Sequence, residues 1–361
     1  DEFRIDGFRL DATHAIMDES PRHILEEMTH AIHQHGAFAI AEDARNDSRL
    51  ILPVEENGLG FDGVWADDFH HTTRVANTKE GEGYLGDFTG ALTEIVDTLR
   101  NGWFYRGQYS ASKGGKRGSE CRHLAPRKFI HCISNHDQAG NRAMGDRLNH
   151  TIGREAYLAA SALLCLTPYT PLLFMGQEWA ASTPFLFFTD HNEELGRLVT
   201  KGRREEFKDF SGFQSEAALE RIPDPQAAKT FLDSKLAWDE MGDEKKAYTL
   251  ELYRRCLALR RGEEAFRPAG RESWYVEALT MGAGALRLKG ATSDWLLLFD
   301  LTGGHDGPLA EEWICKPRSP QGWAAVLSTN EKQFGGNGAC AYDAAAHQAR
   351  FTQPELVVLR S

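Results

Sequence analysis

Short apolar runs alternate with longer helical patterns over about the first 268 positions of the chain. Five of the runs have the length and the polar ends of buried strands, at 7–11, 37–41, 61–65, 128–134 and 171–175. The stretches 155–166 and 247–261 repeat apolar residues at helical spacing. Strands that alternate with helices are typical of βα units, so the pattern predicts an α/β fold with a mainly parallel sheet.

The pattern of apolar and polar residues changes after about Pro268. Short segments of alternating apolar and polar residues, such as 285–288 and 295–299, follow one another with glycines between them. This pattern predicts antiparallel strands. We therefore expect an α/β domain in residues 1–267 and a C-terminal all-β accessory domain in residues 268–361.

Two segments of the α/β part lack a clear period. Residues 105–122 are rich in Gly, Ser, Lys and Arg, which predicts an exposed loop. An ordinary surface loop is the favoured interpretation, and a lid over a binding site is the alternative. Residues 183–233 are charged and aromatic and follow the fifth predicted strand, so they look like an insertion at the end of the sheet where α/β barrels keep their sites.

The composition narrows the class of protein. With 361 residues, 41% of them hydrophobic, the chain can bury a large core, and its net charge of −12 argues against binding nucleic acid through phosphates. The six cysteines are far apart and show no zinc-binding spacing, so we expect reduced thiols in a cytoplasmic protein. No apolar run is long enough to span a bilayer, and a membrane is not an expected partner.

Three of the predicted strands end on an acid. Asp11, Glu42 and Asp137 each close an apolar run, and parallel strands place such ends at one edge of the sheet. Cleavage of a glycosidic bond needs one carboxylic acid to protonate the leaving oxygen and one carboxylate to attack or to activate water. Taken singly, the three motifs are better explained as an ion pair, a helix start and a turn. Together in one βα array they favour a catalytic site.

The neighbours of each acid suggest its role. Arg9 lies two residues before Asp11, on the same face of the strand, where it can hold that carboxylate ionised and aligned as a nucleophile needs. Glu42 follows five apolar or small residues, and partial desolvation raises a carboxyl pKa as a general acid requires. His136 and Asp137 can grip adjacent sugar hydroxyls together.

These motifs resemble a known family. They are similar, in order and spacing, to the second, third and fourth signature regions of the α-amylase superfamily, glycoside hydrolase family 13, at 7–12, 41–43 and 134–137. The resemblance implies a (β/α)₈ barrel and a retaining α-glucan enzyme. The family's nucleophile, general acid and transition-state stabiliser would correspond to Asp11, Glu42 and Asp137, with Arg9 and His136 as subsite partners.

Within that superfamily the details are most similar to the maltooligosyltrehalose trehalohydrolases, in the segments 11–16, 41–46, 65–71, 135–148 and 188–191. This implies hydrolysis of the α-1,4 bond next to a terminal trehalosyl unit, a step of trehalose biosynthesis, with maltooligosyltrehalose and related α-1,4-glucans as partners. No cofactor is expected, because the sequence has no glycine-rich phosphate loop between a strand and a helix. Two alternatives stay open. One is a glycogen branching or debranching enzyme of the same superfamily, and the other is an inactive α-glucan-binding fragment.

The resemblance begins at the fourth strand of the family's barrel. The family's N-terminal β-sandwich and barrel strands 1–3 have no counterpart in the sequence, so we expect a C-terminal fragment with a partial (β/α)₈ barrel of about strands 4 to 8. Such a fragment would expose two unpaired edges and an apolar interior. We expect it to be inactive or poorly folded in isolation, although all three acids are present.

Further polar residues are candidate contacts to the sugar. At the end of the third strand, alternation would put Asp68 and His70 on one face, and we expect both to bind substrate hydroxyls. A metal site is not expected, because adjacent residues in an extended segment do not converge on an ion. The other candidates follow predicted strands, and they are His14, Trp179, Asp190 and His191. For Trp179, a place in the core is the alternative, and for His14, a surface position without contact to the sugar.

Overall fold

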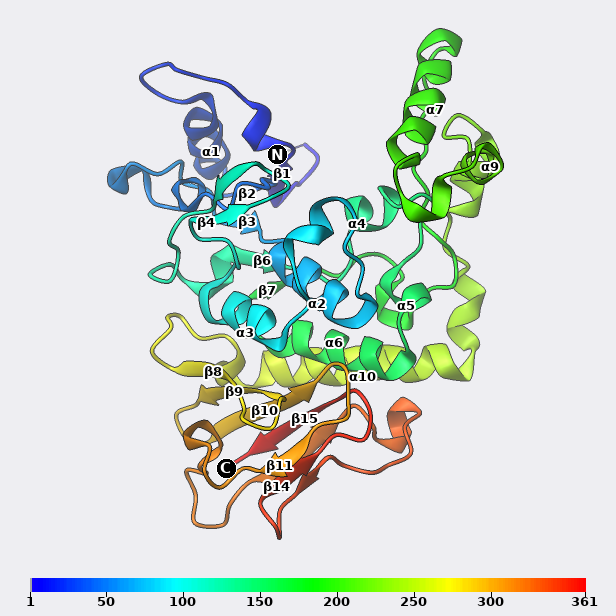
Figure 1. Cartoon of the computed structure of the whole chain (residues 1–361). Helices are drawn as coiled ribbons and strands as arrows, with labels where there is room; N and C mark the ends of the chain where they lie inside the picture. The colour runs from blue at the N-terminus through cyan, green and yellow to red at the C-terminus, as the bar shows by residue number, and fades with distance from the viewer. Residues whose placement is uncertain (1) are drawn as a thin grey trace.

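The computed structural model describes residues 2–361. Five strands form one sheet in the order β1-β2-β3-β6-β7 (Figure 1), with the bounds Gly7–Leu10, Phe38–Ala41, Gly63–Trp65, Phe129–His131 and Thr170–Pro171. All four neighbouring pairs are parallel. The predicted α/β class with a mainly parallel sheet is confirmed.

The strands at the two edges of this sheet differ from the prediction in detail. The fifth strand starts at Thr170 and is only two residues long, because Pro171 lacks an N–H and the chain leaves the sheet soon after it. At the opposite edge, Phe8 on β1 and Phe38 on β2 are 45% and 47% exposed. Part of the apolar surface of the sheet therefore faces solvent beside β1.

Ten α-helices lie within the described residues, and their bounds are α1 Ile24–Gln34, α2 Asp68–Thr78, α3 Leu92–Asn101, α4 His136–Gly140, α5 Leu148–Thr151, α6 Arg154–Leu166, α7 Glu193–Phe207, α8 Glu216–Glu220, α9 Ala228–Asp233 and α10 Glu244–Gly262. The two helices expected near 155–166 and 247–261 are confirmed as α6 and α10. Helix α6 is buried from Ala156 to Leu166 because it packs against α10 and also against the main sheet of the C-terminal part. None of the helices in the described part combines the length and the apolar composition of a membrane-spanning segment.

The C-terminal part is antiparallel, as predicted. Its main sheet has the order β12-β15-β10-β9-β8, with the bounds Ala324–Ser328, Glu355–Arg360, Asp294–Asp300, Gly284–Lys289 and Trp274–Ala278. A smaller sheet has the order β11-β14-β13, with the bounds Asp306–Pro308, Gln348–Arg350 and Tyr342–Asp343.

The central strand β10 is buried on both faces. Its residues alternate between two cores: Leu297 and Phe299 join the core that contains α6, whereas Leu296 and Leu298 join a second core inside the C-terminal part. The first of these cores also contains residues of the parallel sheet, such as Ala39. Figure 1 shows the resulting layers, with α6 and α10 between the parallel sheet and the antiparallel one.

The two segments without a clear period are both structured. Residues 105–122 contain a hairpin of β4 (Gln108–Ser110) and β5 (Gly115–Arg117), so the expectation of a plain loop was wrong. The strands of this hairpin are too short to show a period in sequence. The insertion at 183–233 contains α7, α8 and α9, and Figure 1 shows it projecting at the upper right.

Candidate active site

Asp11 and Glu42 are fixed relative to each other by the ends of β1 and β2. Ala12 has a left-handed backbone with φ of 45°, and its N–H donates to Glu42 Oε2 at 2.7 Å. Thr13 donates from its N–H to the Glu42 carbonyl at 3.0 Å and from its hydroxyl to the buried Asp43 carboxylate at 2.8 Å. These bonds hold the two carboxyl groups on a rigid part of the fold.

One guanidinium links the three predicted catalytic acids. Arg9 Nη1 donates to Asp11 Oδ1 at 2.5 Å. Arg9 Nη2 lies 4.0 Å from Glu42 Oε2 and 3.7 Å from Asp137 Oδ2. The Trp65 ring supports this cation, with its centroid 4.2 Å from the guanidinium carbon. Arg9 therefore offsets the repulsion among three carboxyl groups that the sheet gathers at one edge.

Asp137 lies in the first turn of the short helix α4. Asn135 caps this helix, because its side-chain oxygen accepts the N–H of Gln138 at 2.7 Å. His136 Nε2 lies 3.4 Å from Asp137 Oδ2, and the His136 ring packs edge-on against Trp65 with 5.8 Å between centroids. The structure thus brings His136 to the group formed by Arg9 and the acids.

Glu42 and Asp11 have different surroundings. The side chain of Glu42 is 17% exposed and that of Asp11 is 75% exposed. Burial raises the pKa of Glu42 above its usual value, against the opposing effects of the Ala12 N–H and of Arg9. A carboxyl group with a raised pKa beside a solvated and ion-paired one is the arrangement in which a proton donor and a nucleophile work together.

The three acids line one cavity of about 360 Å³, which we call the central cavity. The other residues that line it are Ala44, Asp67, His71, Tyr84, Phe88, Ser112, Lys113, Arg117, Gln138 and Asn141. Aromatic walls with a few convergent polar groups are typical of small-molecule sites. The cavity can therefore bind a hydroxyl-rich molecule beside a proton donor and a carboxylate.

At the end of β3, Asp67 and His71 reach the central cavity, whereas Asp68 and His70 do not. Helix α2 begins at Asp68, so positions 67 and 71 share one helical face. Asp68 and His70 are 0% and 2% exposed. The alternation expected for a strand was wrong here because the chain is already helical. An acid directly before a helical first turn was the signal that could have shown it.

Asp67 is enclosed at the cavity wall. Burial raises the pKa of its carboxyl group, and the Cys132 thiol lies 3.8 Å from Asp67 Oδ1. His71 packs its ring 5.0 Å from that of Tyr84 and 5.3 Å from that of Phe88. These residues form a partly apolar part of the wall of the central cavity.

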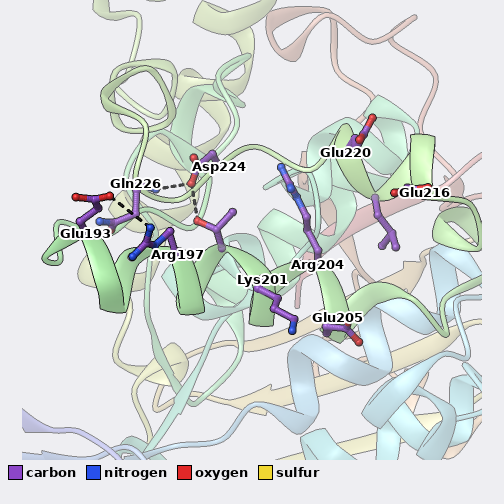
Figure 2. A pocket seen from close by; sticks show the side chains of 12 residues that line it. Glu193, Arg197, Lys201, Arg204, Glu205, Glu216, Glu220, Asp224 and Gln226 are labelled. Atoms are coloured by element: carbon purple, nitrogen blue, oxygen red, sulfur yellow. Dashed lines mark hydrogen bonds and ion pairs between the residues drawn. The ribbon is translucent and has the colours of Figure 1, made fainter.

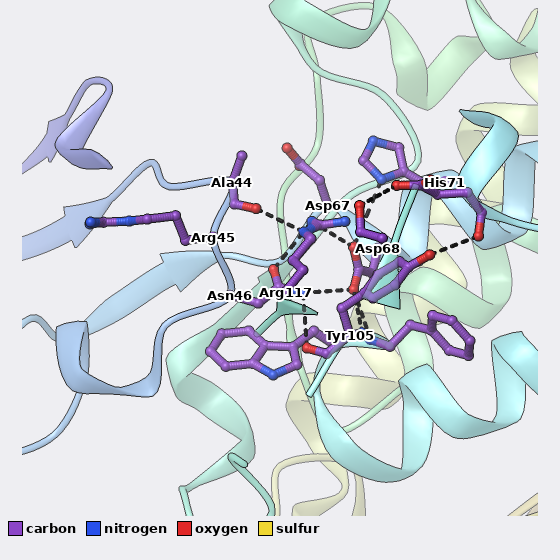
Figure 3. A network of polar contacts seen from close by, with 12 residues as sticks. Ala44, Arg45, Asn46, Asp67, Asp68, His71, Tyr105 and Arg117 are labelled. Carbon is purple, nitrogen blue, oxygen red and sulfur yellow. Dashed lines mark hydrogen bonds and ion pairs between the residues drawn. The ribbon is translucent and has the colours of Figure 1, made fainter. Parts of the chain in front are cut away.

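Asp68 has a structural partner instead of a place at the cavity (Figure 3). Its Oδ2 accepts three hydrogen bonds, from Asn46 Nδ2 at 2.7 Å and from the backbone N–H groups of Phe104 and Tyr105 at 2.8 and 3.0 Å. Its Oδ1 lies 2.9 Å from Arg117 Nη2. Burial opposes ionisation of Asp68, but Arg117 and then His71 hold its pKa well below the usual range.

The hairpin at 105–122 contributes to the wall of the central cavity. An ordinary surface loop was the favoured expectation for this segment, and a lid over a binding site was the alternative. Ser112 and Lys113 in its turn and Arg117 at its end line the central cavity. Arg117 also donates from Nε to the carbonyl of Ala44 at 2.9 Å, which ties the hairpin to the segment after Glu42. The sequence showed a loop rich in basic residues, but the contact of Arg117 with Ala44 joins positions far apart in the chain and leaves no local signal.

His14 lies beside the central cavity and not in it. A second cavity of about 410 Å³, the His14 cavity, is lined by His14, Arg45, Asp47, Lys116, Gly118 and Ser119 and shares Ala44, Lys113 and Arg117 with the central one. The two spaces are therefore neighbours, and the lining of the His14 cavity includes Ala44 and Arg45, which follow Glu42 in the chain by two and three positions.

Trp179, Asp190 and His191 are not brought to these cavities. Trp179 is 2% exposed and donates from Nε1 to Glu240 Oε1 at 2.9 Å, so it belongs to the core, which was the alternative for it. Asp190 and His191 are exposed at the start of the insertion, and neither lines the central cavity or the His14 cavity. Their expected contacts with substrate at the central cavity are not supported by these positions.

Another groove, of about 560 Å³, lies on the insertion beside α7 (Figure 2). It is lined by residues of both charge signs, among them Arg197, Lys201, Glu193 and Glu205, and it shares no lining residue with the central cavity. Within residues 2–361, no three His, Cys, Asp or Glu side chains converge as metal ligands do.

Comparison with known proteins places this arrangement in a family, although no protein-family model matches the chain. Over 276 residues it is 47% identical to the malto-oligosyltrehalose trehalohydrolase of Deinococcus radiodurans, a match that covers 75% of this chain and 44% of that protein. The enzyme of the same name from Rhizobium sp. is 43% identical, with 72% and 44% covered. The chain spans less than half the length of these relatives.

A solved structure agrees with the sequence relatives. The crystal structure of a candidate alpha-amylase from Salmonella typhimurium superposes with a TM-score of 0.82 at 32% identity, and covers 100% of this chain and 58% of that one. The fold, the position of the acids at strand ends and these similarities agree. The chain belongs to the α-amylase family of glycoside hydrolases, as a homologue of the malto-oligosyltrehalose trehalohydrolases.

Proposed function

We propose that the protein is a retaining α-glycoside hydrolase that cleaves the α-1,4 bond beside the terminal trehalosyl unit of maltooligosyltrehalose and releases trehalose. The observation that carries the proposal is the shared contact of Arg9 with Asp11, Glu42 and Asp137 at the wall of one cavity. The names of the sequence relatives supply the substrate. Other α-1,4-glucans are its related partners.

In the first step of this mechanism, Glu42 donates its proton to the glycosidic oxygen while the Asp11 carboxylate attacks the anomeric carbon. The bond to trehalose breaks, and a glucosyl ester forms on Asp11. In the second step Glu42, now ionised, takes a proton from water, and the resulting hydroxide displaces Asp11. Asp137 and His136 hold hydroxyl groups of the same sugar ring.

The surroundings of Glu42 and Asp11 support this division of roles. A buried glutamic acid keeps its proton to a higher pH and can deliver it to the leaving oxygen. Asp11 is exposed toward the cavity and aligned by Arg9, which suits attack on a carbon atom that carries developing positive charge.

A glucan-binding role without turnover is the second candidate. It is favoured by one observation: the chain matches only 40–46% of the length of its trehalohydrolase relatives. A branching or debranching reaction would keep the same acids, but the seven curated relatives share the trehalohydrolase name.

The test is incubation of the chain with maltooligosyltrehalose, maltohexaose and glycogen, with free trehalose as the readout. Trehalose from the first substrate would support the proposal and overturn the expectation of an inactive fragment. We then expect a loss of at least about 1,000-fold in Asp11→Asn with little change in stability, because Asp11 is mostly exposed. Rapid cleavage of maltohexaose without trehalose release would contradict the specific substrate. Glucan binding without any cleavage would favour the second candidate.

We also place the protein in the cytoplasm. Its six cysteines are free, and five of them are buried, which is typical of a reducing compartment.

A further inference from the structure

The C-terminal part carries two adjoining aromatic rings at its surface, which we call the aromatic pair. Trp313 is 55% exposed, although the next two residues, Ile314 and Cys315, are fully buried. Its ring meets that of the partly exposed Tyr275 edge-on, with 5.3 Å between centroids. Single exposed apolar residues are common, but adjoining exposed rings form the kind of patch that marks a binding surface.

The backbone that carries Trp313 is firmly anchored. Trp313 begins a 3-10 helix of three residues, and the other two belong to the second core. Before the helix, the carboxylate of Glu312 accepts the N–H of Thr280 at 2.7 Å. After it, Arg287 donates from Nη1 to the carbonyl of Lys316 at 2.7 Å. The exposed ring of Trp313 therefore stands on a fixed support.

Tyr275 is held on β8, the edge strand of the main C-terminal sheet. Its hydroxyl accepts a hydrogen bond from Lys289 Nζ at 3.2 Å and donates to the carbonyl of Glu272 at 3.4 Å. Lys289 Nζ also lies 4.6 Å from the centroid of the Tyr275 ring. An aromatic side chain that is already fixed loses little entropy when a ligand packs against it.

A groove of about 560 Å³ lies beside the same strand, between β8 and α3, and we call it the junction groove. Its lining includes Glu277 of β8 and Asp97 and Arg100 of α3. Glu277 follows Tyr275 by two residues, so both side chains lie on one face of the strand. Figure 1 shows α3 next to β8, and the two elements are in contact.

The polar groups of the junction groove are held in place by one another. Arg100 donates from Nη2 to the carbonyl of Val276 at 3.0 Å and to Glu277 Oε2 at 3.1 Å. Asp97 Oδ2 accepts from Arg106 Nη2 at 3.2 Å. The carboxylates of Asp97 and Glu277 stay partly exposed, so each keeps lone pairs for further donors. Fixed carboxylates of this kind accept hydroxyl groups strongly.

This combination fits a sugar better than other ligands. A pyranose ring has an apolar face of C–H groups that packs on an aromatic ring, and a rim of hydroxyl groups that donate to carboxylates. The net charge of −12 and the two carboxylates of the groove disfavour nucleic acid. A purely apolar partner would bury the same carboxylates without donors, which costs free energy.

We propose that the aromatic pair and the junction groove form a second, non-catalytic binding site for α-1,4-linked glucans. Glucose units stack on Trp313 and Tyr275, and their hydroxyl groups donate to Glu277 and Asp97. The inference goes beyond the proposed function and takes from it only the class of sugar. Among residues 2–361, none that lines the central cavity belongs to this site, so a glucan bound here leaves the three acids accessible.

Fluorine NMR of the full chain labelled with 5-fluorotryptophan tests the site, because each of the eight tryptophans gives its own signal. Trp313→Phe assigns the signal of Trp313 by removing it. Trp238→Phe does the same for the matched control, Trp238, which is 66% exposed and lies outside the aromatic pair and the junction groove. We expect maltoheptaose to shift the Trp313 signal in a saturable way and to leave the Trp238 signal unchanged.

Two tyrosine variants measure the contribution of the neighbouring ring. In Tyr275→Ala the Kd read from the Trp313 shift should rise about 5-fold, because one stacking surface is lost. In Tyr109→Ala, which removes an exposed tyrosine of β4, the Kd should stay the same. Melting temperatures close to that of the native chain show that the fold of each variant is kept. The shift itself is read in the unsubstituted chain and does not depend on them.

Three results would overturn the second site. They are an unmoved Trp313 signal at about 20 mM maltoheptaose, an equal shift with the β-linked cellohexaose, and a Trp313 signal that moves with protein concentration in the absence of sugar. The last would show a contact between two copies of the chain. Trehalose release from maltooligosyltrehalose is measured in parallel. If release is absent while the Trp313 signal still shifts, the proposed function fails and the second site is supported.

Discussion

Replacing Arg117 by methionine should destabilise the protein by about 3 kcal/mol at pH 7. Asp68 is 0% exposed and the Arg117 side chain only 9% exposed, and their 2.9 Å contact is the closest cation contact of that carboxylate. Removing one partner of a buried pair costs about 3–5 kcal/mol, because the other charge stays buried. The low end applies here, since Asp68 Oδ2 keeps its three hydrogen bonds from Asn46, Phe104 and Tyr105.

The effect should depend on pH with a definite sign. In the native protein the pKa of Asp68 is lowered, so its contribution to stability is present above about pH 4 and is lost as the pH falls through the folded-state pKa. Without Arg117, burial dominates and the carboxyl group takes up a proton at a higher pH in the folded chain than in the unfolded one. The stability difference between variant and native protein should therefore shrink from pH 7 to pH 4.5.

Urea unfolding followed by tryptophan fluorescence at both pH values measures this difference. Lys116→Met is the matched control, because Lys116 is the exposed neighbour of Arg117 in β5, and it should change stability by less than about 0.5 kcal/mol. Combining Arg117→Met with Asp68→Asn should destabilise less than Arg117→Met alone. A loss below about 1 kcal/mol at pH 7, or the same loss at pH 4.5, would refute the reasoning.

Three further substitutions test the site and its frame. Glu42→Gln should lower turnover by at least about 100-fold and yet stabilise the fold by about 0.5–1 kcal/mol at pH 7 but not at pH 4. The reason is that the pKa of Glu42 is raised in the folded protein, so ionised Glu42 lowers stability as the pH rises. Turnover assays and urea unfolding at both pH values measure the two effects. Trp179→Phe should lower the free energy of unfolding in urea by about 1–2 kcal/mol and leave the Kd for maltoheptaose unchanged, because Trp179 is buried. A higher Kd in the variant would indicate that Trp179 contacts the glucan. Thr13→Val should cost about 1–2 kcal/mol in thermal unfolding, because the carboxylate of Asp43 loses its hydroxyl donor, and unchanged stability would contradict this.

The acids were predictable because their signal is local. Each ends an apolar run, and a parallel sheet brings the C-terminal ends of its strands to one edge, so Asp11, Glu42 and Asp137 had to lie near one another once the sheet was inferred. The spacing of two residues along a strand was enough to predict that the side chain of Arg9 lies beside that of Asp11. Its further contacts with the other two acids need the order of the sheet, which the pattern of strands does not contain.

The prediction of cavity-facing residues was wrong after β3, where the chain changes from strand to helix within a few residues. After Trp65 the chain passes from strand to helix within two residues, so a period of two was applied to a segment whose period is 3.6. That exchange of periods moved the prediction from Asp67 and His71 to Asp68 and His70. Partners far apart in the chain could not be predicted for another reason. Arg117 and Asp68 are 49 positions apart, and the sequence of a loop with several basic residues does not show which of them is buried.

The same division separates the three acids from the cavity beside them. The acids lie at strand ends and on the first turn of a helix, where backbone hydrogen bonds fix them and where sequence patterns are strong. A cavity beside the central one is lined by Tyr84 and by Phe207, Phe210 and Phe213, which belong to segments more than 120 residues apart. Its shape depends on the hydrogen bonds of Arg203 and on the course of the insertion. The insertion can therefore vary in sequence while the acids and Arg9 stay in place, because no residue of α7–α9 lines the central cavity.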